Sequence, residues 1–282
     1  MRSNTHYCTM LKRNPLLTSI TITTVLALVL ICLITANRAP AAYAAEQQYS
    51  MVGKWGSRGS GFGKFSQPLD VAIDPSGNVY VSDFGNAQNG IQKFTSNGTF
   101  ITSWGSTGLG DGQFINPAGI AVDSAGNVYV GDFGENNRIQ KFDSNGDLIT
   151  KWGTPGTGDG QFINPGDIAI DKAGNLYVVD AGNDRIQKFD SNGKFITKWG
   201  TTGSADGQLS GPVGIAIDSS GNIYVSDTGN NRIQKFDSNG KFITKWSVGV
   251  PFGIAVEPNG KVYVINQNAA SIEIYSPVSQ LQ

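Results

Sequence analysis

The chain has 282 residues, of which 21 are basic and 22 acidic, and its formal net charge is −1. Its two cysteines, Cys8 and Cys32, and its single histidine, His6, all lie close to the N-terminus. The rest of the chain therefore has no thiol for a disulfide or a nucleophile and no imidazole for zinc binding or proton transfer. The absence of a basic run argues against nucleic acid as a partner.

The first 45 residues are predicted to be a signal peptide or a membrane anchor. Lys12 and Arg13 precede the apolar run Val25–Ile34, and Ala42-Tyr43-Ala44 follows as a small-x-small cleavage site. The uncharged stretch Leu16–Ala36 is also long enough to remain in the membrane as an uncleaved anchor. Both alternatives predict that the remainder is exported through the cytoplasmic membrane, to an extracellular or cell-surface location.

One sequence pattern occurs five times in residues 46–282, which we assign to a single repeat domain. All five tryptophans lie in phase with it, at spacings of 49, 48, 47 and 47 residues. A constant period of this size predicts a propeller, a solenoid or an array. The copies begin at Pro68, Pro117, Pro165, Pro212 and Pro251.

Each copy predicts four β-strands joined by tight turns. Asn145-Gly146 in the second copy is a strong hairpin signal, because both residues tolerate left-handed backbone angles. Four antiparallel strands in about 47 residues are typical of one blade of a β-propeller, so we predict an all-β, five-bladed propeller. In the second copy the predicted strands are Ile120–Asp123, Val128–Val130, Arg138–Phe142 and Leu148–Trp152.

The two ends of the repeat region complement each other. Tyr49–Gly56 resembles a fourth strand without the three that should precede it, whereas the last copy stops after its third strand, Ser271–Tyr275. We expect the N-terminal strand to complete the last blade, which closes a monomeric ring and covers an unpaired sheet edge. The alternative is a six-fold curvature whose gap is closed by a partner or a second copy.

Loop lengths vary on only one face of the predicted propeller. From the aspartate that ends the second strand to the isoleucine of the third, the spacing is 8 residues from Asp83, 7 from Asp132 and 6 from Asp180. The turns on the opposite face are uniform. Variable loops on a rigid scaffold often bind ligands, so we expect a ligand on the variable face.

The string Asp227–Phe236, DTGNNRIQKF, with Gly214–Asp218 upstream, resembles the NHL-repeat family. The resemblance covers residues 49–282 and implies a β-propeller, commonly with six blades, so five copies depart from the usual number. Members bind proteins or RNA, form extracellular sensor modules or, in a minority, act as lyases. The lyases depend on histidines, which residues 49–282 lack. Similar gluconolactonase propellers hold a divalent metal through scattered Glu, Asn and Asp residues; no positions of this chain are assigned to that role, and the possibility stays open.

An aspartate and an arginine recur on either side of the loop between the second and third strands. One interpretation is an ion pair that braces each blade. The other is a ring of charges around the channel mouth that binds a ligand. The first copy has an aspartate, Asp83, but no arginine. The complete pairs are Asp132 with Arg138, Asp180 with Arg185, and Asp227 with Arg232.

Asp70 and Asp167 are not part of the repeat pattern. The same position is glycine in the other three copies, at Gly119, Gly214 and Gly253. Both aspartates precede the innermost strand, whose side chains approach the central channel. They predict binding of a cation or a polar ligand, with Ca²⁺ as one candidate, although two carboxylates alone are too few for that ion. Solvated loop residues are the alternative.

Together these features predict a secreted or surface-tethered binding module that is not an enzyme and has no resident cofactor. It would recognise a protein, a peptide or a glycan on the variable face. The alternative function is a metal-dependent lyase or lactonase that uses Asp and Asn oxygens near the channel. A third possibility is a purely architectural role.

Overall fold

The computed structural model describes residues 53–277 apart from Asn89. These residues belong to one compact unit, which begins at Gly53. None of the helices within them is both long enough and apolar enough to cross a bilayer. The predicted signal peptide or anchor, residues 1–45, lies outside the described residues.

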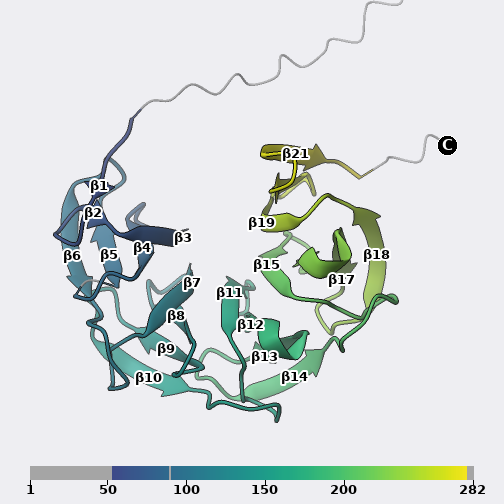
Figure 1. Ribbon diagram of the computed structural model, residues 1–282, viewed down its shortest axis with the longest axis horizontal. Coiled ribbons are helices and arrows are strands. Elements are labelled where there is room, and N and C mark those ends of the chain that lie inside the picture. The colour runs from purple at the N-terminus through teal and green to yellow at the C-terminus, as the bar shows by residue number, and fades with distance from the viewer. Residues whose placement is uncertain (1–52, 89, 278–282) are drawn as a thin grey trace, which may run out of the picture. The chain divides into compact units, whose positions relative to one another are not determined.

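The described unit is a five-bladed, all-β propeller, as the repeats predict (Figure 1). Each blade is one antiparallel sheet whose strands pair in chain order, and the first strand of each sheet lies innermost, beside the channel. The first and second blades consist of β3 (Gln67–Ile73), β4 (Val79–Phe84), β5 (Ile91–Phe94) and β6 (Phe100–Trp104), and of β7 (Asn116–Val122), β8 (Val128–Phe133), β9 (Arg138–Phe142) and β10 (Leu148–Trp152). The third and fourth consist of β11 (Pro165–Ile170), β12 (Leu176–Asp180), β13 (Arg185–Phe189) and β14 (Phe195–Trp199), and of β15 (Pro212–Ile217), β16 (Ile223–Asp227), β17 (Arg232–Phe236) and β18 (Phe242–Ser247). The fifth consists of β19 (Pro251–Val256), β20 (Val262–Asn266) and β21 (Ser271–Tyr275).

Four short elements lie in the loops on the predicted variable face. β1 (Ser57–Arg58) and β2 (Lys64–Phe65) form a parallel pair in the loop that leads into β3. The corresponding loops of the next three blades each have a single parallel bridge instead. The 3₁₀ turns η2 (Ala181–Asn183) and η3 (Thr228–Asn230) follow β12 and β16.

Aromatic rings hold neighbouring blades together. Trp199 lies 6.0 Å from the ring of Tyr177 in its own blade and 6.0 Å from Phe236 in the next blade. Trp152 makes the same two contacts one blade earlier, with Tyr129 and Phe189. Phe114, Phe162 and Leu209, from the loops between blades, are buried at the same boundaries, as their common phase in the repeats predicts. Such ring pairs contribute packing beyond the apolar area that they bury.

Trp55 takes the same place on the first blade. Its ring lies 4.4 Å from Phe94 and 5.9 Å from Phe65. A Cβ atom at Gly98 would approach it to 2.3 Å, much as one at Gly146 would meet Trp104 at 2.6 Å. Trp55 therefore occupies the same place on the first blade that the tryptophan of each fourth strand occupies on the next blade.

The fifth blade has three strands within the described residues. The segment expected to supply its fourth strand is Tyr49–Gly56. Its first part, Tyr49–Val52, lies outside the described residues, and Gly53–Gly56 forms no strand. Pairing of this segment with β21 therefore remains a prediction.

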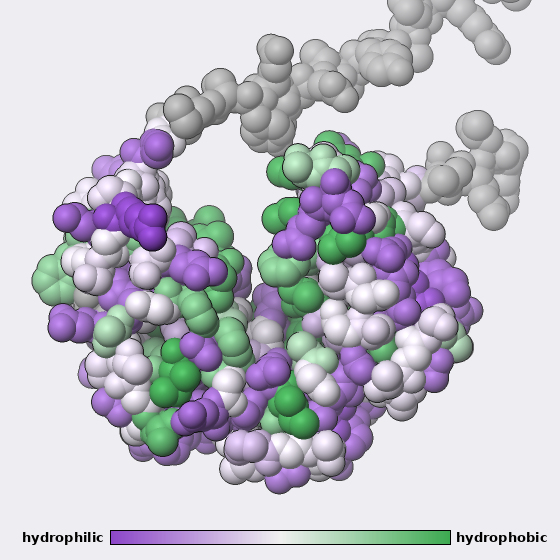
Figure 2. Space-filling model, viewed as in Figure 1, coloured by the Kyte–Doolittle hydropathy of each residue, from purple (hydrophilic) through white to green (hydrophobic). Residues whose placement is uncertain are grey.

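The first and fifth blades leave apolar side chains exposed where the ring is open. Val71 on β3 is 58% exposed, whereas the equivalent Ile120, Ile168 and Ile215 are 3–5% exposed. Ile272 on β21 is 68% exposed, and its equivalent Ile186 is fully buried. Figure 2 shows hydrophobic residues on the part of the last blade that borders this opening. Within the described residues, no neighbouring blade covers these faces of the first and fifth blades.

We predict that substituting Gly240 destabilises the protein mainly through a clash with the interblade tryptophan. Gly240 has φ +83°, and a Cβ there would lie 2.4 Å from the Trp199 ring. Gly221 has nearly the same angle, φ +84°, but open space around it, so it is the matched control. Gly221→Ala should cost about 1 kcal/mol for the left-handed backbone. Gly240→Ala should cost a further 1–3 kcal/mol or so for overpacking, measured by chemical denaturation. Equal losses in the two variants would contradict the packing role of Trp199.

Candidate functional site

A buried aspartate at the end of the second strand holds the loop that leads into the inner strand of the same blade. Asp227 has no exposed surface. Its Oδ1 atom accepts the Ser210 backbone N–H at 2.8 Å, and the Asn230 amide donates to both carboxylate oxygens at 3.0 Å. Because Ser210 lies two residues before β15, these bonds set where the inner strand begins. Asp83, Asp132 and Asp180 accept the corresponding loop N–H groups in the first three blades.

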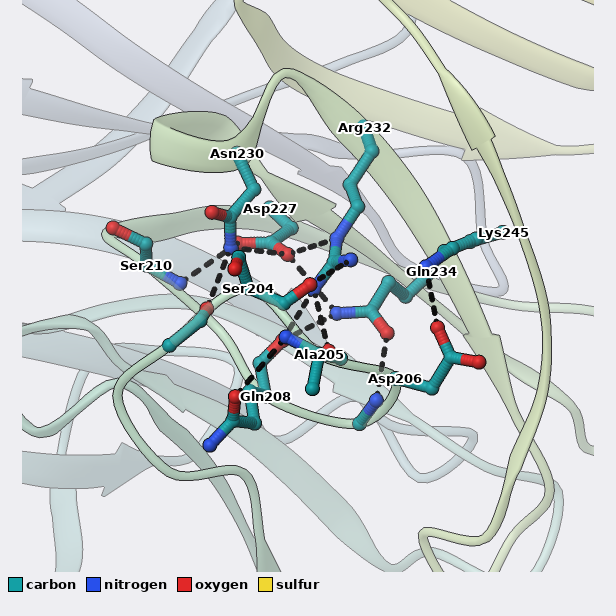
Figure 3. A network of polar contacts seen from close by, with 12 residues as sticks. Ser204, Ala205, Asp206, Gln208, Ser210, Asp227, Asn230, Arg232, Gln234 and Lys245 are labelled. Carbon is teal, nitrogen blue, oxygen red and sulfur yellow. Dashed lines mark hydrogen bonds and ion pairs between the residues drawn. The ribbon is translucent and has the colours of Figure 1, made fainter.

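An arginine completes the brace in the fourth blade (Figure 3). The Nε atom of Arg232 lies 2.6 Å from Asp227 Oδ2. Its two terminal nitrogens donate to the carbonyl oxygens of Ser204, Ala205 and Gln208 at 2.7–2.9 Å. The Gln234 side chain joins them, donating to Gln208 O at 2.6 Å and to Asp227 Oδ2 at 3.0 Å. The network closes the loop before β15 onto β16 and β17.

The other predicted pairs occupy the same position in their blades. Arg185 lies 2.7 Å from Asp180 and makes the same three carbonyl contacts, while Arg138 lies 3.5 Å from Asp132. The aspartates have no exposed surface and the arginines are 6–7% exposed. The structure thus places these residues in loop braces. A ring of charges open to a ligand would require exposed side chains, whereas these are buried.

The first and fifth blades carry modified braces. Asp83 has no arginine, and the Asn86 amide donates to it at 2.8 Å. In the fifth blade Asn266 and Glu273 replace the aspartate and the glutamine of the other blades, and Asn266 donates to Glu273 at 2.6 Å. The hydrogen-bonded braces on the variable face therefore differ most from the repeat in the first and fifth blades.

A cavity of about 760 Å³ lies in the channel on the side of the variable loops. Apolar side chains dominate its wall, and they come from every blade of the described unit. Among the described residues, its polar side chains are Asp70, Asp167 and Asn164, and no lysine or arginine lines it. The large apolar members of the wall are Leu69, Val71, Val81, Phe133, Val213, Phe252 and Ile265.

Asp70 and Asp167 each connect two neighbouring inner strands. Asp70 accepts the N–H of Val71 beside it and that of Ile120 on β7, both at 2.8 Å. Asp167 accepts the N–H of Ile168 at 2.7 Å and that of Ile215 on β15 at 2.9 Å. Each carboxylate oxygen thus has one backbone donor and retains capacity for a further hydrogen bond.

A local break in strand pairing frees these side chains from the sheet. In the third blade the register shifts between Pro165 and Ile168, so Asp167 lies in a bulge of β11. In the first blade the shift lies between Pro68 and Asp70, so Asp70 pairs with Ser82 directly after the bulge. Bulges redirect side chains and are common beside active sites. Here they direct two carboxylates to one cavity.

Gly119 separates the two aspartates and contributes no side chain. A Cβ atom there would lie 2.4 Å from the Gly166 carbonyl oxygen and 2.6 Å from Asp167 Cα. Glycine therefore lets β7 approach β11 closely. The glycine of this repeat is as necessary to the cavity as the two aspartates.

The cavity changes the ionisation of both carboxyl groups. Burial raises the pKa of Asp70, and its two backbone hydrogen bonds oppose that rise. Burial, reinforced by the charge of Asp70, raises the pKa of Asp167 to about 8. Asp167 is half-buried, and it lines the cavity. Perturbed carboxyl groups in a cavity are typical of functional sites.

Sequence reasoning missed the aromatic part of the cavity wall. Phe133 stacks on Phe84 of the neighbouring blade, with ring centroids 5.8 Å apart and planes inclined by 6°. Phe252 occupies a position that holds leucine, alanine, glycine or valine in the other copies. Ile265 similarly replaces serine, glycine or valine. The signal was available, because these residues depart from the repeat as Asp70 and Asp167 do.

The two aspartates are not part of a larger metal-binding cluster. Within residues 53–277, Asn89 excepted, no three His, Cys, Asp or Glu side chains are grouped to hold a metal ion. Ca²⁺ requires six to eight oxygen ligands, which two carboxylates and an apolar wall do not provide.

Removing the arginine of one brace should destabilise the protein strongly. Arg232→Ala leaves Asp227 charged, buried and without its partner, so we expect a loss of about 3–5 kcal/mol in the free energy of unfolding. Lys245 pairs with Asp206 in the same region, but their side chains are 43% and 55% exposed. Lys245→Ala should therefore cost less than about 1 kcal/mol. Urea denaturation of both variants tests this. Similar losses in the free energy of unfolding would show that the buried brace stabilises the protein no more than an exposed ion pair does.

Asp167→Asn should change how stability depends on pH. The folded protein retains the Asp167 proton up to about pH 8, whereas an unfolded aspartate releases it near pH 4. The folded state therefore binds more protons between these values, and this carboxyl lowers stability as the pH rises from about 4 to about 8. Asparagine does not titrate, so Asp167→Asn should gain on the order of 1–2 kcal/mol relative to wild type across that window.

Denaturation series at pH 5 and pH 8.5 measure the effect. Asp147→Asn, which removes an exposed carboxylate on the opposite face, is the control for net charge. A difference between Asp167→Asn and wild type that is the same at both pH values would contradict the burial of this carboxyl.

The model of the NHL repeat matches four segments of the chain in the phase of the blades. They cover residues 65–88, 114–142, 162–189 and 209–236. None of the curated proteins matches the chain.

Several solved structures are similar in fold. A catalytically inactive virginiamycin B lyase from Staphylococcus aureus, solved with quinupristin, is 18% identical at a TM-score of 0.57, over 76% of this chain and 71% of that one. A chain in a nidogen/laminin complex is 21% identical at a TM-score of 0.57, over 74% of this chain and 75% of that one. A gluconolactonase from Xanthomonas campestris is 16% identical at a TM-score of 0.56, over 76% of this chain and 74% of that one. Identities this low establish the fold alone. The four repeat matches, in phase with the blades of the propeller, identify the chain as a member of the NHL-repeat β-propellers.

Proposed function

We propose that this protein is a non-catalytic binding module whose ligand enters the channel cavity from the variable face. The observation that carries the proposal is the cavity itself, with an apolar wall and two carboxylates that the blades do not require. A mostly apolar cavity with a few directed polar groups is the common form of a ligand site.

The braces support this role because they make the cavity rigid. Each buried aspartate fixes the loop before an inner strand, and the inner strands carry the wall. A site held in its binding geometry loses little conformational entropy when the ligand binds. The variable loops surround the entrance and would contact the larger part of a protein, peptide or glycan ligand.

The proposed setting is outside the cytoplasmic membrane, secreted or tethered at the cell surface. It follows from the predicted signal peptide or anchor in residues 1–45. A structurally similar propeller occurs in a nidogen/laminin complex, which supports protein binding as a use of this fold.

A cavity-blocking variant tests the site. Ala181 lies in η2 and lines the cavity, so Ala181→Trp should obstruct it. Ala173 is exposed on the opposite face, and Ala173→Trp is the matched control. Peptide, glycan and small-molecule panels are screened against wild-type protein by thermal shift, and each binder is titrated against both variants. We expect a loss of at least tenfold in affinity for Ala181→Trp and less than twofold for Ala173→Trp. Binders that tolerate Ala181→Trp, or panels without any binder, would contradict the proposal.

One observation favours an enzyme as the second candidate. With its pKa near 8, Asp167 holds a proton at neutral pH and is therefore able to act as a general acid. The similar folds include a lyase and a gluconolactonase. A metal-dependent lyase or lactonase would retain a divalent ion through purification without chelator. Stoichiometric metal that is lost in Asp70→Ala and Asp167→Ala, together with turnover of a lactone, would favour the enzyme over the binding module.

A further inference from the structure

We infer that the cavity binds an organic cation with an apolar body, such as a primary amine on an aromatic or aliphatic chain. This inference rests on the proposed binding function and names the chemistry of its ligand. Asp70 and Asp167 would receive the ammonium group, and the aromatic and aliphatic wall would enclose the rest.

The charge of the cavity lining supports a cation. Both ionisable side chains that line the cavity are acidic. Each aspartate has two backbone N–H donors, which are neutral, and none of the lining residues supplies a positive charge to offset it. Carboxylates removed from water are costly unless a cation or further hydrogen bonds compensate them. An ammonium group supplies both, with a positive charge and up to three N–H donors.

The wall favours an organic cation over a bare ion. Phe133 and Phe252 lie on different blades and both border the cavity. Aromatic faces attract cations and bury apolar surface as well. Leu69, Val213 and Ile265 add aliphatic surface. A hydrated metal ion gains nothing from such a wall, whereas an amine with a phenyl or alkyl group buries both of its parts.

Binding should also release a proton. Of the side chains in the part of the chain that the structure describes, only the two aspartates line the cavity with a charge. In the empty cavity Asp167 is mostly protonated at pH 7, because its pKa lies near 8. A nearby ammonium stabilises the carboxylate, so the proton leaves as the amine binds. This linkage distinguishes ionic recognition from simple burial of an apolar molecule.

The test is isothermal titration of the full chain at pH 7 with phenethylamine. The control ligand, 2-phenylethanol, has the same ring and chain length but no charge. We expect the amine to bind at least tenfold more tightly than the alcohol. Repeating the titration in buffers of different ionisation enthalpy should show release of between half a proton and one proton for each amine bound.

Two variants assign the effect to the cavity. Asp167→Asn should weaken phenethylamine binding at least tenfold and abolish most of the proton release. Asp147→Asn removes the same charge from the opposite face and should change the affinity less than twofold. Thermal melts establish that both variants are folded, and Phe133→Leu, which keeps apolar volume but removes the ring, should weaken the amine by a smaller factor.

Equal affinities for amine and alcohol, or unchanged amine binding in Asp167→Asn, would overturn the inference. So would Ca²⁺ binding at the aspartates without any binding of the amine. In each of these cases the proposed binding function stands if another ligand loses affinity in Ala181→Trp, and it fails with the inference if none does.

Discussion

The buried aspartate at the end of the second strand, present in the first four blades, is the constraint on which the rest of the propeller depends. It accepts backbone N–H groups from the loop that precedes the inner strand, and so sets where that strand begins. In three blades an arginine ties the same aspartate to carbonyl groups farther along the loop. A carboxylate without exposed surface would be very costly without these donors. The same hydrogen bond in four successive blades therefore indicates that the loop before the inner strand has the same conformation in each of them.

That constraint turns a repeated scaffold into a specific cavity. Because the braces hold each inner strand in the same place, a change of one side chain there alters the channel without altering the blade. Asp70 and Asp167 are such changes, and Gly119 between them keeps the strands close. Phe252 and Ile265 are further changes in the fifth blade, where the brace itself differs. The residues of the proposed site thus depart from the repeat, whereas the braces belong to it.

Much of the fold could be predicted from the repeats because local interactions determine it. The strands Arg138–Phe142 and Leu148–Trp152 occur with the predicted bounds, since the hairpin between them is set by an Asn-Gly turn. The inner strand of that blade begins earlier than predicted, at Asn116 instead of Ile120. Its first residues pair through a bulge after Pro117, which the alternation of apolar residues does not reveal. Pairing of Tyr49–Val52 with the last blade lies outside the described residues.

The candidate site was predictable only in part. Comparison of the copies identified Asp70 and Asp167, because glycine stands at that position elsewhere. The paired Asp and Arg residues fitted two interpretations, and only their burial distinguishes a brace from an exposed ring of charges. That the two aspartates share one cavity with Phe133 depends on contacts between blades, which no single repeat encodes.

The central claim is that these two carboxyl groups lie close together in one cavity, where burial perturbs their ionisation. Carbon-13 NMR titration of the Asp167 side chain, in wild-type protein and in Asp70→Asn, tests it most directly. The account predicts a wild-type midpoint near pH 8 that falls when the neighbouring charge is removed. A midpoint near pH 4 in both proteins would show that Asp167 is solvated and distant from Asp70, and would contradict the account.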